Sequence, residues 1–267
     1  QSVAKLLSSL DEQNFKDITI YVDGSRSNRD AADVDKVAAI AESYSNVECI
    51  KRSFNWGMYY NIVDGLSRIE AEEFIVLEED LSVTHLSLLI DQLTDLWDKN
   101  LFSISLMSYL KASPTKDVEY FELDRFFCWG WFTKKEKLVE LNFNRISLAL
   151  ETSKLSVLRH GDLSSMYYNA LTRRNNSWAA VVSANVINKG WKNIMFRGGV
   201  VQNVGYDGEN MNVAHKNIFR QYLIDRIPSN MTLIKLSIFE YWRIHWRFRK
   251  PLKAIVYIYE IFTGTRK

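Results

Sequence analysis

The chain has 267 residues, 47% hydrophobic and 25% charged, enough for one large globular domain or one domain with a small appendage. Its net charge of +2, from 34 basic and 32 acidic side chains, lacks the overall basic excess of nucleic-acid-binding domains. No apolar run reaches the roughly 18 residues of a membrane span. Two cysteines, Cys49 and Cys128, offer no disulfide framework, so we expect a cytoplasmic protein.

The first hundred residues alternate between helical and strand patterns. Apolar spacing predicts helices over 3–10, 34–44, 57–69 and 85–97, and short apolar runs predict strands over 18–22, 47–50, 74–77 and 102–107. This alternation predicts an α/β fold with a largely parallel sheet flanked by helices. Because the pattern opens with a helix, we expect either a further strand before it or an irregular sheet edge.

The second half is less regular. Aromatic residues crowd positions 126–132, and the pattern predicts helices over 133–141, 163–173 and 178–188, with strands near Ile194 and over 200–204. There is no internal repeat and no low-complexity linker, and the chain has only three prolines. We therefore expect one domain over 1–230, followed by a helical appendage over 231–267.

The appendage differs from the body in composition. Residues 235–267 hold eight Lys or Arg and two acids, interleaved with aromatic residues, and Pro251 divides the segment. Basic and interfacial aromatic side chains suit an anionic membrane surface, which makes the segment 233–267 a candidate membrane contact. Two helices that pack on the core with a solvated basic side explain the same pattern.

Acidic residues follow two of the predicted strands. Asp23-Gly24-Ser25 ends the strand over 18–22, and Glu78-Glu79-Asp80 ends the strand over 74–77. Ligands of open α/β sheets bind beyond the carboxyl ends of strands, where carboxylates can hold a hard cation against a diphosphate. The alternatives are an ordinary Asp-Gly turn and acidic residues that stabilise the positive end of the following helix.

A third motif, Trp129-Gly130-Trp131, lies in the aromatic stretch. Two indoles around a glycine offer flat apolar faces and N–H donors to a sugar ring, and glycine permits close approach. Core packing is the alternative interpretation for these tryptophans.

Taken in order, these motifs resemble a known family. Asp23-Gly24-Ser25, the run from Arg52 to Gly57, Leu77 to Asp80 and Trp129 to Trp131 resemble bacterial surface-polysaccharide glycosyltransferases of the Rossmann-like GT-A fold. Those enzymes are in turn similar to N-acetylglucosaminyltransferase I. The resemblance continues through 176–179 and 203–208, so it covers about residues 1–212, and it also implies a strand before the first helix.

The resemblance implies an inverting transfer of a hexosyl or N-acetylhexosaminyl group. The donor is a nucleotide-diphosphate sugar, and the acceptor is a hydroxyl of a glycan or lipid-linked glycan in surface polysaccharide synthesis. It assigns a divalent metal, Mn²⁺ or Mg²⁺, to Asp80, and the nucleotide to Asp23. The remaining donor-binding residues that we assign are Gly24, Ser25, Arg52, Asn55, Gly57, Glu78 and Glu79, and the acceptor-binding residues are Trp129, Gly130 and Trp131.

A general base must deprotonate the acceptor hydroxyl. Asp162 follows the tryptophan motif roughly as the base does in the relatives, and Asp207 is the second candidate. Either residue can instead be a turn or helix-capping aspartate. Arg197 and Arg52 are candidate phosphate contacts, although single arginines are more often surface residues.

The chain departs from the family pattern at two points. The acidic cluster usually reads Glu-Asp-Asp, whereas Glu79 is its middle member here, and no histidine follows Asp207-Gly208 in register. These departures leave open a catalytically inactive module that binds a nucleotide sugar or glycan. A nucleotidyltransferase is a third interpretation. The glycine-rich phosphate loop that typically opens such enzymes is not found in the sequence, but the strand that we expect before the first helix weakens this exclusion.

Overall fold

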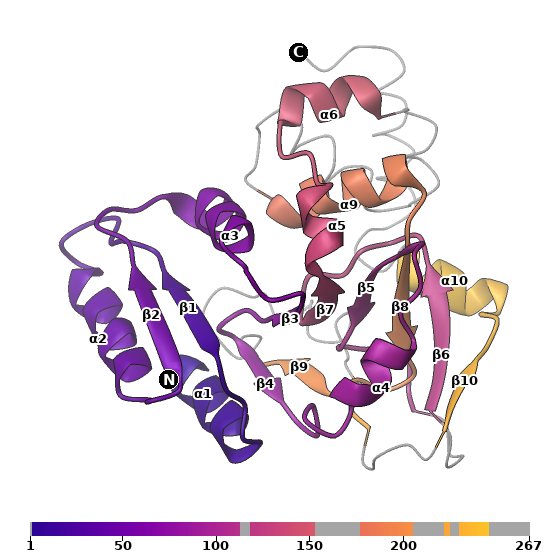
Figure 1. Ribbon diagram of the computed structural model, residues 1–267, viewed down its shortest axis with the longest axis horizontal. Coiled ribbons are helices and arrows are strands. Elements are labelled where there is room, and N and C mark those ends of the chain that lie inside the picture. Colours follow the sequence, from indigo (N-terminus) through magenta and orange to yellow (C-terminus); the bar gives the residue numbers. More distant parts are fainter. Residues whose placement is uncertain (1, 113–117, 153–176, 205–221, 225–229, 246–267) are drawn as a thin grey trace.

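The computed structural model describes residues 2–112, 118–152, 177–204, 222–224 and 230–245, which form an α/β structure (Figure 1). At the N-terminal side, β1 (Ile18–Val22) and β2 (Val47–Lys51) pair in parallel. Three helices accompany them: α1 (Ser2–Glu12), α2 (Ala31–Glu42) and α3 (Gly57–Ser67). These five elements match the predicted alternation, with bounds that differ by a few residues.

The larger sheet has six strands in the order β10-β6-β8-β5-β7-β3. Its strands are β3 (Glu73–Val76), β5 (Leu101–Ser105), β6 (Val118–Leu123), β7 (Trp131–Lys134), β8 (Lys192–Phe196) and β10 (Met231–Leu233). Only the β5–β8 and β6–β10 pairs are parallel, and the other three pairs are antiparallel. The sheet is therefore mixed, which corrects the expectation of a largely parallel one.

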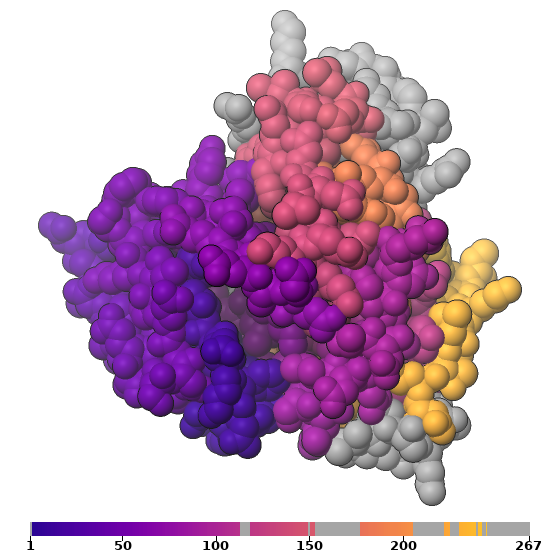
Figure 2. Space-filling view, viewed as in Figure 1, coloured from indigo at the N-terminus to yellow at the C-terminus, as the bar shows by residue number. Residues whose placement is uncertain are grey.

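Two short strands and five helices complete the described structure. β4 (Leu81–Val83) pairs antiparallel with β9 (Val201–Asn203). The helices are α4 (Ile90–Asp95), α5 (Lys135–Val139), α6 (Arg145–Glu151), α9 (Trp178–Lys189) and α10 (Ile238–His245). Figure 2 shows that the surface is hollowed, on this face, between the indigo-to-purple N-terminal elements and the elements of the larger sheet.

Two predicted helices are shorter than expected. The helix predicted over 133–141 begins as strand β7, because residues 131–134 pair with β3 and β5, and this tertiary pairing overrides the helical spacing. The helix predicted over 85–97 is reduced to α4, and the left-handed φ of 56° at His85 rules out a helix that begins there. The helix predicted over 163–173 lies outside the described residues.

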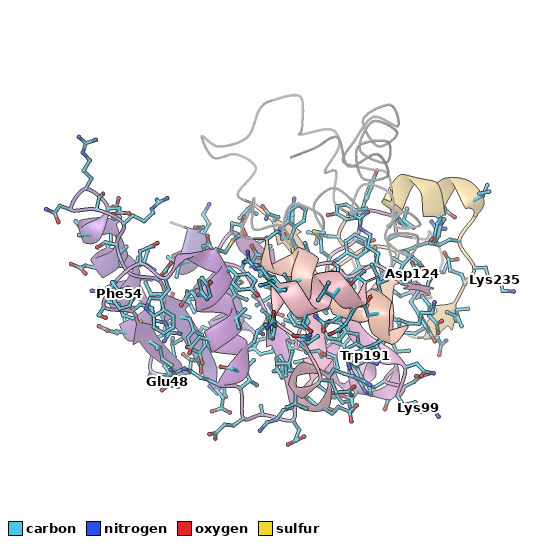
Figure 3. The ribbon with its side chains drawn as sticks, turned by 90° about the horizontal axis from the view of Figure 1, so that it is seen from above. Glu48, Phe54, Lys99, Asp124, Trp191 and Lys235 are labelled. Atoms are coloured by element: carbon cyan, nitrogen blue, oxygen red, sulfur yellow. The ribbon has the colours of Figure 1, made fainter. Side chains whose placement is uncertain are left out.

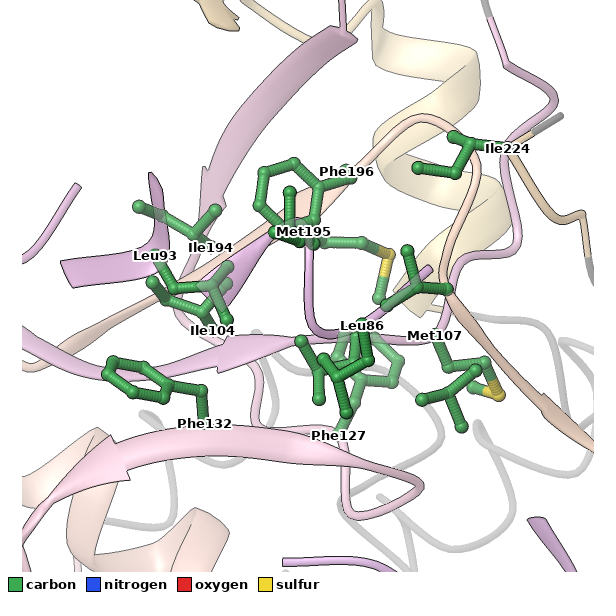
Figure 4. Close-up of a cluster of buried hydrophobic side chains, with 14 of the residues drawn as sticks. Leu86, Leu93, Ile104, Met107, Phe127, Phe132, Ile194, Met195, Phe196 and Ile224 are labelled. Carbon is green, nitrogen blue, oxygen red and sulfur yellow. The ribbon is translucent and has the colours of Figure 1, made fainter. Parts of the chain in front are cut away.

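Helix α1 joins the two sheets. Leu6 and Leu10 belong to the main hydrophobic core, while Val3 and Leu7 pack with Ala41 in a small cluster beside β1 and β2. The main core, part of which is shown in Figure 4, contains Leu86, Leu93, Ile104, Met107, Phe127, Phe132, Ile194, Met195 and Phe196. Because α1 contacts both β4 and α2, it links the strand that follows the acidic tripeptide to the N-terminal elements.

The first part of the predicted appendage is continuous with the body. β10 adds to the edge of the larger sheet, and Ile244 of α10 is fully buried. Arg197 forms ion pairs with Glu119 and Glu240, and Arg125 donates a hydrogen bond to the carbonyl of Ile244. Residues 231–245 therefore pack on the core, and 246–267 lie outside the described residues. Within the described helices, none has the length and hydropathy to cross a membrane.

Candidate functional site

The acidic tripeptide forms a turn between β3 and β4. The backbone N–H of Leu81 donates to the carbonyl of Glu78 at 3.2 Å, so Glu79 and Asp80 occupy the centre of the turn. Glu79 points to solvent, whereas Glu78 and Asp80 are partly buried. The turn thus separates the three carboxylates and directs two of them toward the protein.

Asp80 accepts hydrogen bonds from Asn203 of β9 and from the residue after it. Its carboxylate Oδ2 accepts a hydrogen bond from Asn203 Nδ2 at 2.8 Å, and its carbonyl accepts one from the N–H of Val204 at 2.7 Å. The other carboxylate oxygen, Asp80 Oδ1, is buried and has no hydrogen-bond partner within the described structure, and the same holds for Glu78 Oε1. Buried oxygens without a donor are costly, so a ligand that satisfies them would bind favourably.

The environment of Glu78 favours its neutral form. Burial raises the pKa of Glu78 to about 8, and the negative charges of Asp80 and Glu79 act in the same direction. A hydrogen bond with the Cys128 thiol opposes this shift. Burial and the charge of Glu78 also raise the pKa of Cys128 well above its usual value. Without a cation, the surroundings of Glu78 therefore favour its protonated form.

This shift predicts the pH dependence of stability in the metal-free protein. Because the folded protein binds the Glu78 proton more tightly than the unfolded chain, Glu78 lowers the free energy of unfolding as pH rises from 4.5 toward about 8. The expected loss is on the order of 2 kcal/mol, less than the full shift implies because the side chain is only partly buried. Urea unfolding of the wild type and Glu78→Gln across this range measures it.

Glu78→Gln removes the titrating group, so its free energy of unfolding should fall less than that of the wild type over the same pH range. Glu72→Gln, at an exposed position, is the matched control and should keep the wild-type slope. Equal slopes for the wild type and Glu78→Gln would show that Glu78 titrates normally.

A second group of polar contacts surrounds Asp23 at the end of β1. Its carboxylate accepts hydrogen bonds from the backbone N–H groups of Gly24, Trp56 and Gly57 at 2.9, 2.7 and 2.8 Å, and from Asn55 Nδ2 at 3.0 Å. Asn55 also donates to the carbonyl of Gly24 at 2.8 Å. Asp23 therefore fixes the start of α3 against the end of β1, a role that the sequence prediction of nucleotide contact did not include.

Glycines allow this close approach. A Cβ on Gly24 would lie 2.2 Å from the carbonyl carbon of Phe54, and Gly57 has a left-handed φ of 77°. Ser25, the next residue after Gly24, is partly buried. The predicted donor-binding residues Asp23, Gly24, Asn55 and Gly57 are thus brought together in one loop pair.

The Arg52 side chain is buried, and its guanidinium contacts other side chains of the protein. Its guanidinium forms an ion pair with Asp64, donates to Asn61 Oδ1 at 3.0 Å and lies 4.4 Å from the ring centroid of Trp56. The side chain is only 6% exposed. These contacts occupy the guanidinium within the protein, and the expected phosphate contact of Arg52 stays a prediction. Arg197, paired with Glu119 and Glu240, is likewise a structural residue.

An open pocket of about 540 Å³ adjoins the Asp23 loop. Its lining is Phe54, Asn55, Trp56, Tyr60, Val63, Asp64 and Ser67. Phe54 and Tyr60 are 64% and 63% exposed, and Figure 3 places Phe54 at the outer rim of the N-terminal elements. Trp56 Nε1 is buried without a partner in the described structure. The exposed rings of Phe54 and Tyr60 suit a flat ligand.

The two tryptophans of the third motif have different environments. Trp131 is fully buried on β7 and stacks with Phe102 and Trp178, so it is a core residue, which corrects its assignment to the acceptor. Trp129 is partly exposed and packs edge-on to Tyr109. Gly130 has a φ of 73°, and a Cβ there would lie 3.0 Å from Val201 of β9. Trp129 alone retains an accessible face.

The structure brings Cys128 and Asn203 to the acidic turn, and neither was predicted as a site residue. Asn203 lies in the predicted strand over 200–204 and Cys128 precedes Trp129, but neither local pattern reveals that β9 and the aromatic loop reach Asp80. The predicted bases, Asp162 and Asp207, lie outside the described residues. Among the residues that are described, no three His, Cys, Asp or Glu side chains gather into a potential metal-binding group.

Comparisons with known proteins leave the family of this chain open. Among the protein-family models none matches the sequence, and no curated protein matches it either.

Proposed function

We propose that the chain is a metal-dependent inverting glycosyltransferase. It would use a nucleotide-diphosphate sugar as donor and a hydroxyl of a glycan or lipid-linked glycan as acceptor. The observation that carries the proposal is the pair of buried carboxylate oxygens, Asp80 Oδ1 and Glu78 Oε1, that have no hydrogen-bond partner in the described structure. They lie in the turn that follows β3. The resemblance to GT-A glycosyltransferases implies a metal at this same turn.

The chemistry of these oxygens fits a hard divalent cation. Mg²⁺ and Mn²⁺ prefer carboxylate oxygens, and Mg²⁺ is typically held by one or two carboxylates together with substrate phosphates. Glu78 and Asp80 provide two carboxylates, so a diphosphate would complete the coordination. A cation here would also offset the repulsion between these two side chains, which favours protonation of Glu78 in its absence.

The Asp23 loop supports the nucleotide part of the proposal. Its hydrogen bonds connect the end of β1 to the start of α3, and the pocket beside it offers exposed Phe54 and Tyr60 rings. Because Asp23 already accepts four N–H groups, its main contribution is to position this loop. A base or ribose would then contact groups around Asp23.

Each of these groups would have its own role in the proposed reaction. A bound cation would stabilise the negative charge of the departing nucleoside diphosphate. Asp80 and Glu78 would hold that cation, and Trp129 offers an apolar ring to the acceptor sugar. Asp162 and Asp207 remain the predicted candidates for the base that takes the proton of the acceptor hydroxyl. Attack from the face opposite the leaving group would invert the anomeric carbon.

A thermal-shift panel of nucleotide sugars with and without Mn²⁺ tests the proposal. A matching donor at about 100 times its Kd stabilises the folded protein by about 2.7 kcal/mol, which raises Tm by several degrees. We expect the donor to add this rise only when Mn²⁺ is present, beyond any stabilisation by Mn²⁺ alone, and we expect Asp80→Ala to abolish it. Asp95→Ala, at an exposed position on α4, is the control and should respond like the wild type.

Undiminished Mn²⁺-dependent stabilisation in Asp80→Ala would contradict the assignment of the site. Release of nucleoside diphosphate from the donor that binds then separates a transferase from an inactive binding module. Donor binding that depends on Asp80 without turnover on any glycan acceptor would favour the module.

A further inference from the structure

We infer that Asn203 is a positioning residue for the metal-binding carboxylate of Asp80. The inference rests on the proposed function, because it takes Asp80 as the cation ligand. Asn203 lies on β9, 123 positions from Asp80 in the chain, and its side-chain amide donates to Asp80 Oδ2 at 2.8 Å.

Pairing between β4 and β9 fixes the position of Asn203 relative to Asp80. Leu81, the residue after Asp80, is paired with Asn203 in the antiparallel β4–β9 ladder. On the other side of Asn203, the N–H of Val204 donates to the carbonyl of Asp80 at 2.7 Å. β9 therefore holds both the backbone and the side chain of Asp80, so its carboxylate has a fixed position and rotation.

The chemistry of an amide suits this role. Only the NH₂ group of asparagine can donate to a carboxylate, so the contact defines which way the Asn203 amide faces. A neutral donor orients the carboxylate without cancelling its charge, whereas lysine or arginine would compete with a cation. Oδ2 is thereby occupied, and the buried, unpartnered Oδ1 is left for a ligand. Partners that orient a metal ligand commonly contribute 10- to 100-fold to metal affinity.

Burial supports the same conclusion. Asn203 is only 6% exposed, so water cannot easily replace its hydrogen bond to Asp80. Gln202, its neighbour on β9, pairs with Ser82 and is partly exposed, and the alternation of a strand directs its side chain to the opposite face. Gln202 is therefore a matched control on the same strand.

The test is the Mn²⁺ affinity of the full chain, measured by isothermal titration for the wild type, Asp80→Ala, Asn203→Leu and Gln202→Leu. Leucine keeps the approximate size of asparagine but cannot donate. We expect Asn203→Leu to weaken Mn²⁺ binding about 10-fold or more, and Gln202→Leu to bind like the wild type. The Tm without metal, measured in parallel, separates lost affinity from lost folding.

The outcomes separate a failure of the proposed function from a failure of the positioning role of Asn203. If the wild type binds no Mn²⁺, or if Asp80→Ala binds it equally well, the proposed function fails and the inference falls with it. If Asp80→Ala loses Mn²⁺ but Asn203→Leu binds like the wild type, the positioning role alone is overturned.

A measurement on the wild type covers the case in which Asn203→Leu does not fold. Mn²⁺ broadens the NMR signals of nearby protons, so the side-chain NH₂ signal of Asn203 should disappear at low Mn²⁺ while that of Asn100, exposed before β5, persists. An Asn203 signal that persists as long as that of Asn100 would show that Mn²⁺ does not bind at Asp80, which overturns the proposed function and the inference with it.

Discussion

Gly24→Ala is expected to destabilise the protein by about 3 kcal/mol or more. The added Cβ would lie 2.2 and 2.3 Å from the carbonyl carbon and oxygen of Phe54, so the loop before α3 must move away from β1. That movement also weakens the hydrogen bonds that Asp23 accepts from Trp56 and Gly57. Urea unfolding measures the loss, and donor affinity should fall with it.

Gly190→Ala is the matched control. Gly190 has a left-handed φ of 66° at the end of α9, but a Cβ there meets no atom within 4 Å, so strain is its only cost, about 1 kcal/mol. Equal losses in the two variants would show that the Gly24–Phe54 contact relaxes easily and that the Asp23 loop is not rigid.

Arg52→Leu is expected to lower the free energy of unfolding by about 2 kcal/mol. The substitution removes the part-buried ion pair with Asp64, although Asp64 keeps its pair with Arg68. It also leaves Asn61 Oδ1 without its donor and exchanges the guanidinium over Trp56 for an aliphatic group. Because Arg52 contacts the protein interior, Mn²⁺ affinity at Asp80 should change far less than stability. Urea unfolding and Mn²⁺ titration of the same preparation measure both quantities.

Arg26→Leu provides the comparison for an exposed arginine. Arg26 is 80% exposed and pairs with Asp30 within its own loop, so its removal should leave stability almost unchanged. Similar effects for Arg26 and Arg52, or a loss of donor binding in Arg52→Leu without a loss of stability, would instead favour a phosphate contact for Arg52.

The strands and helices near the N-terminus were predictable because their residues alternate with clear periods. Ile18–Val22 and Glu73–Val76 end where acidic residues begin, so the sequence also revealed the two loops that carry Asp23 and Asp80. The environment of these carboxylates was not predictable. Asn55 was assigned to the donor site, but its hydrogen bond to Asp23 was not, and Cys128 and Asn203 reach the acidic turn through tertiary contacts that no local pattern reports.

The mixed sheet likewise depends on tertiary pairing that local sequence patterns do not report. Trp131–Lys134 reads as part of an aromatic stretch followed by a helix, and only its pairing with both β3 and β5 makes it a strand. That pairing buries the Trp131 ring and leaves Trp129 partly exposed. Local spacing reports which residues are apolar, but the choice of strand partner decides which aromatic ring reaches a ligand.

The central claim is that the turn after β3 holds a divalent cation through Asp80. Its most direct test is the anomalous difference density of Mn²⁺ in crystals grown with Mn²⁺ and the nucleoside diphosphate of the donor that binds. The site described here predicts a Mn²⁺ peak in direct contact with Asp80 Oδ1, with the diphosphate on its other side. A bound nucleotide whose Mn²⁺ contacts neither Asp80 nor Glu78 would contradict it.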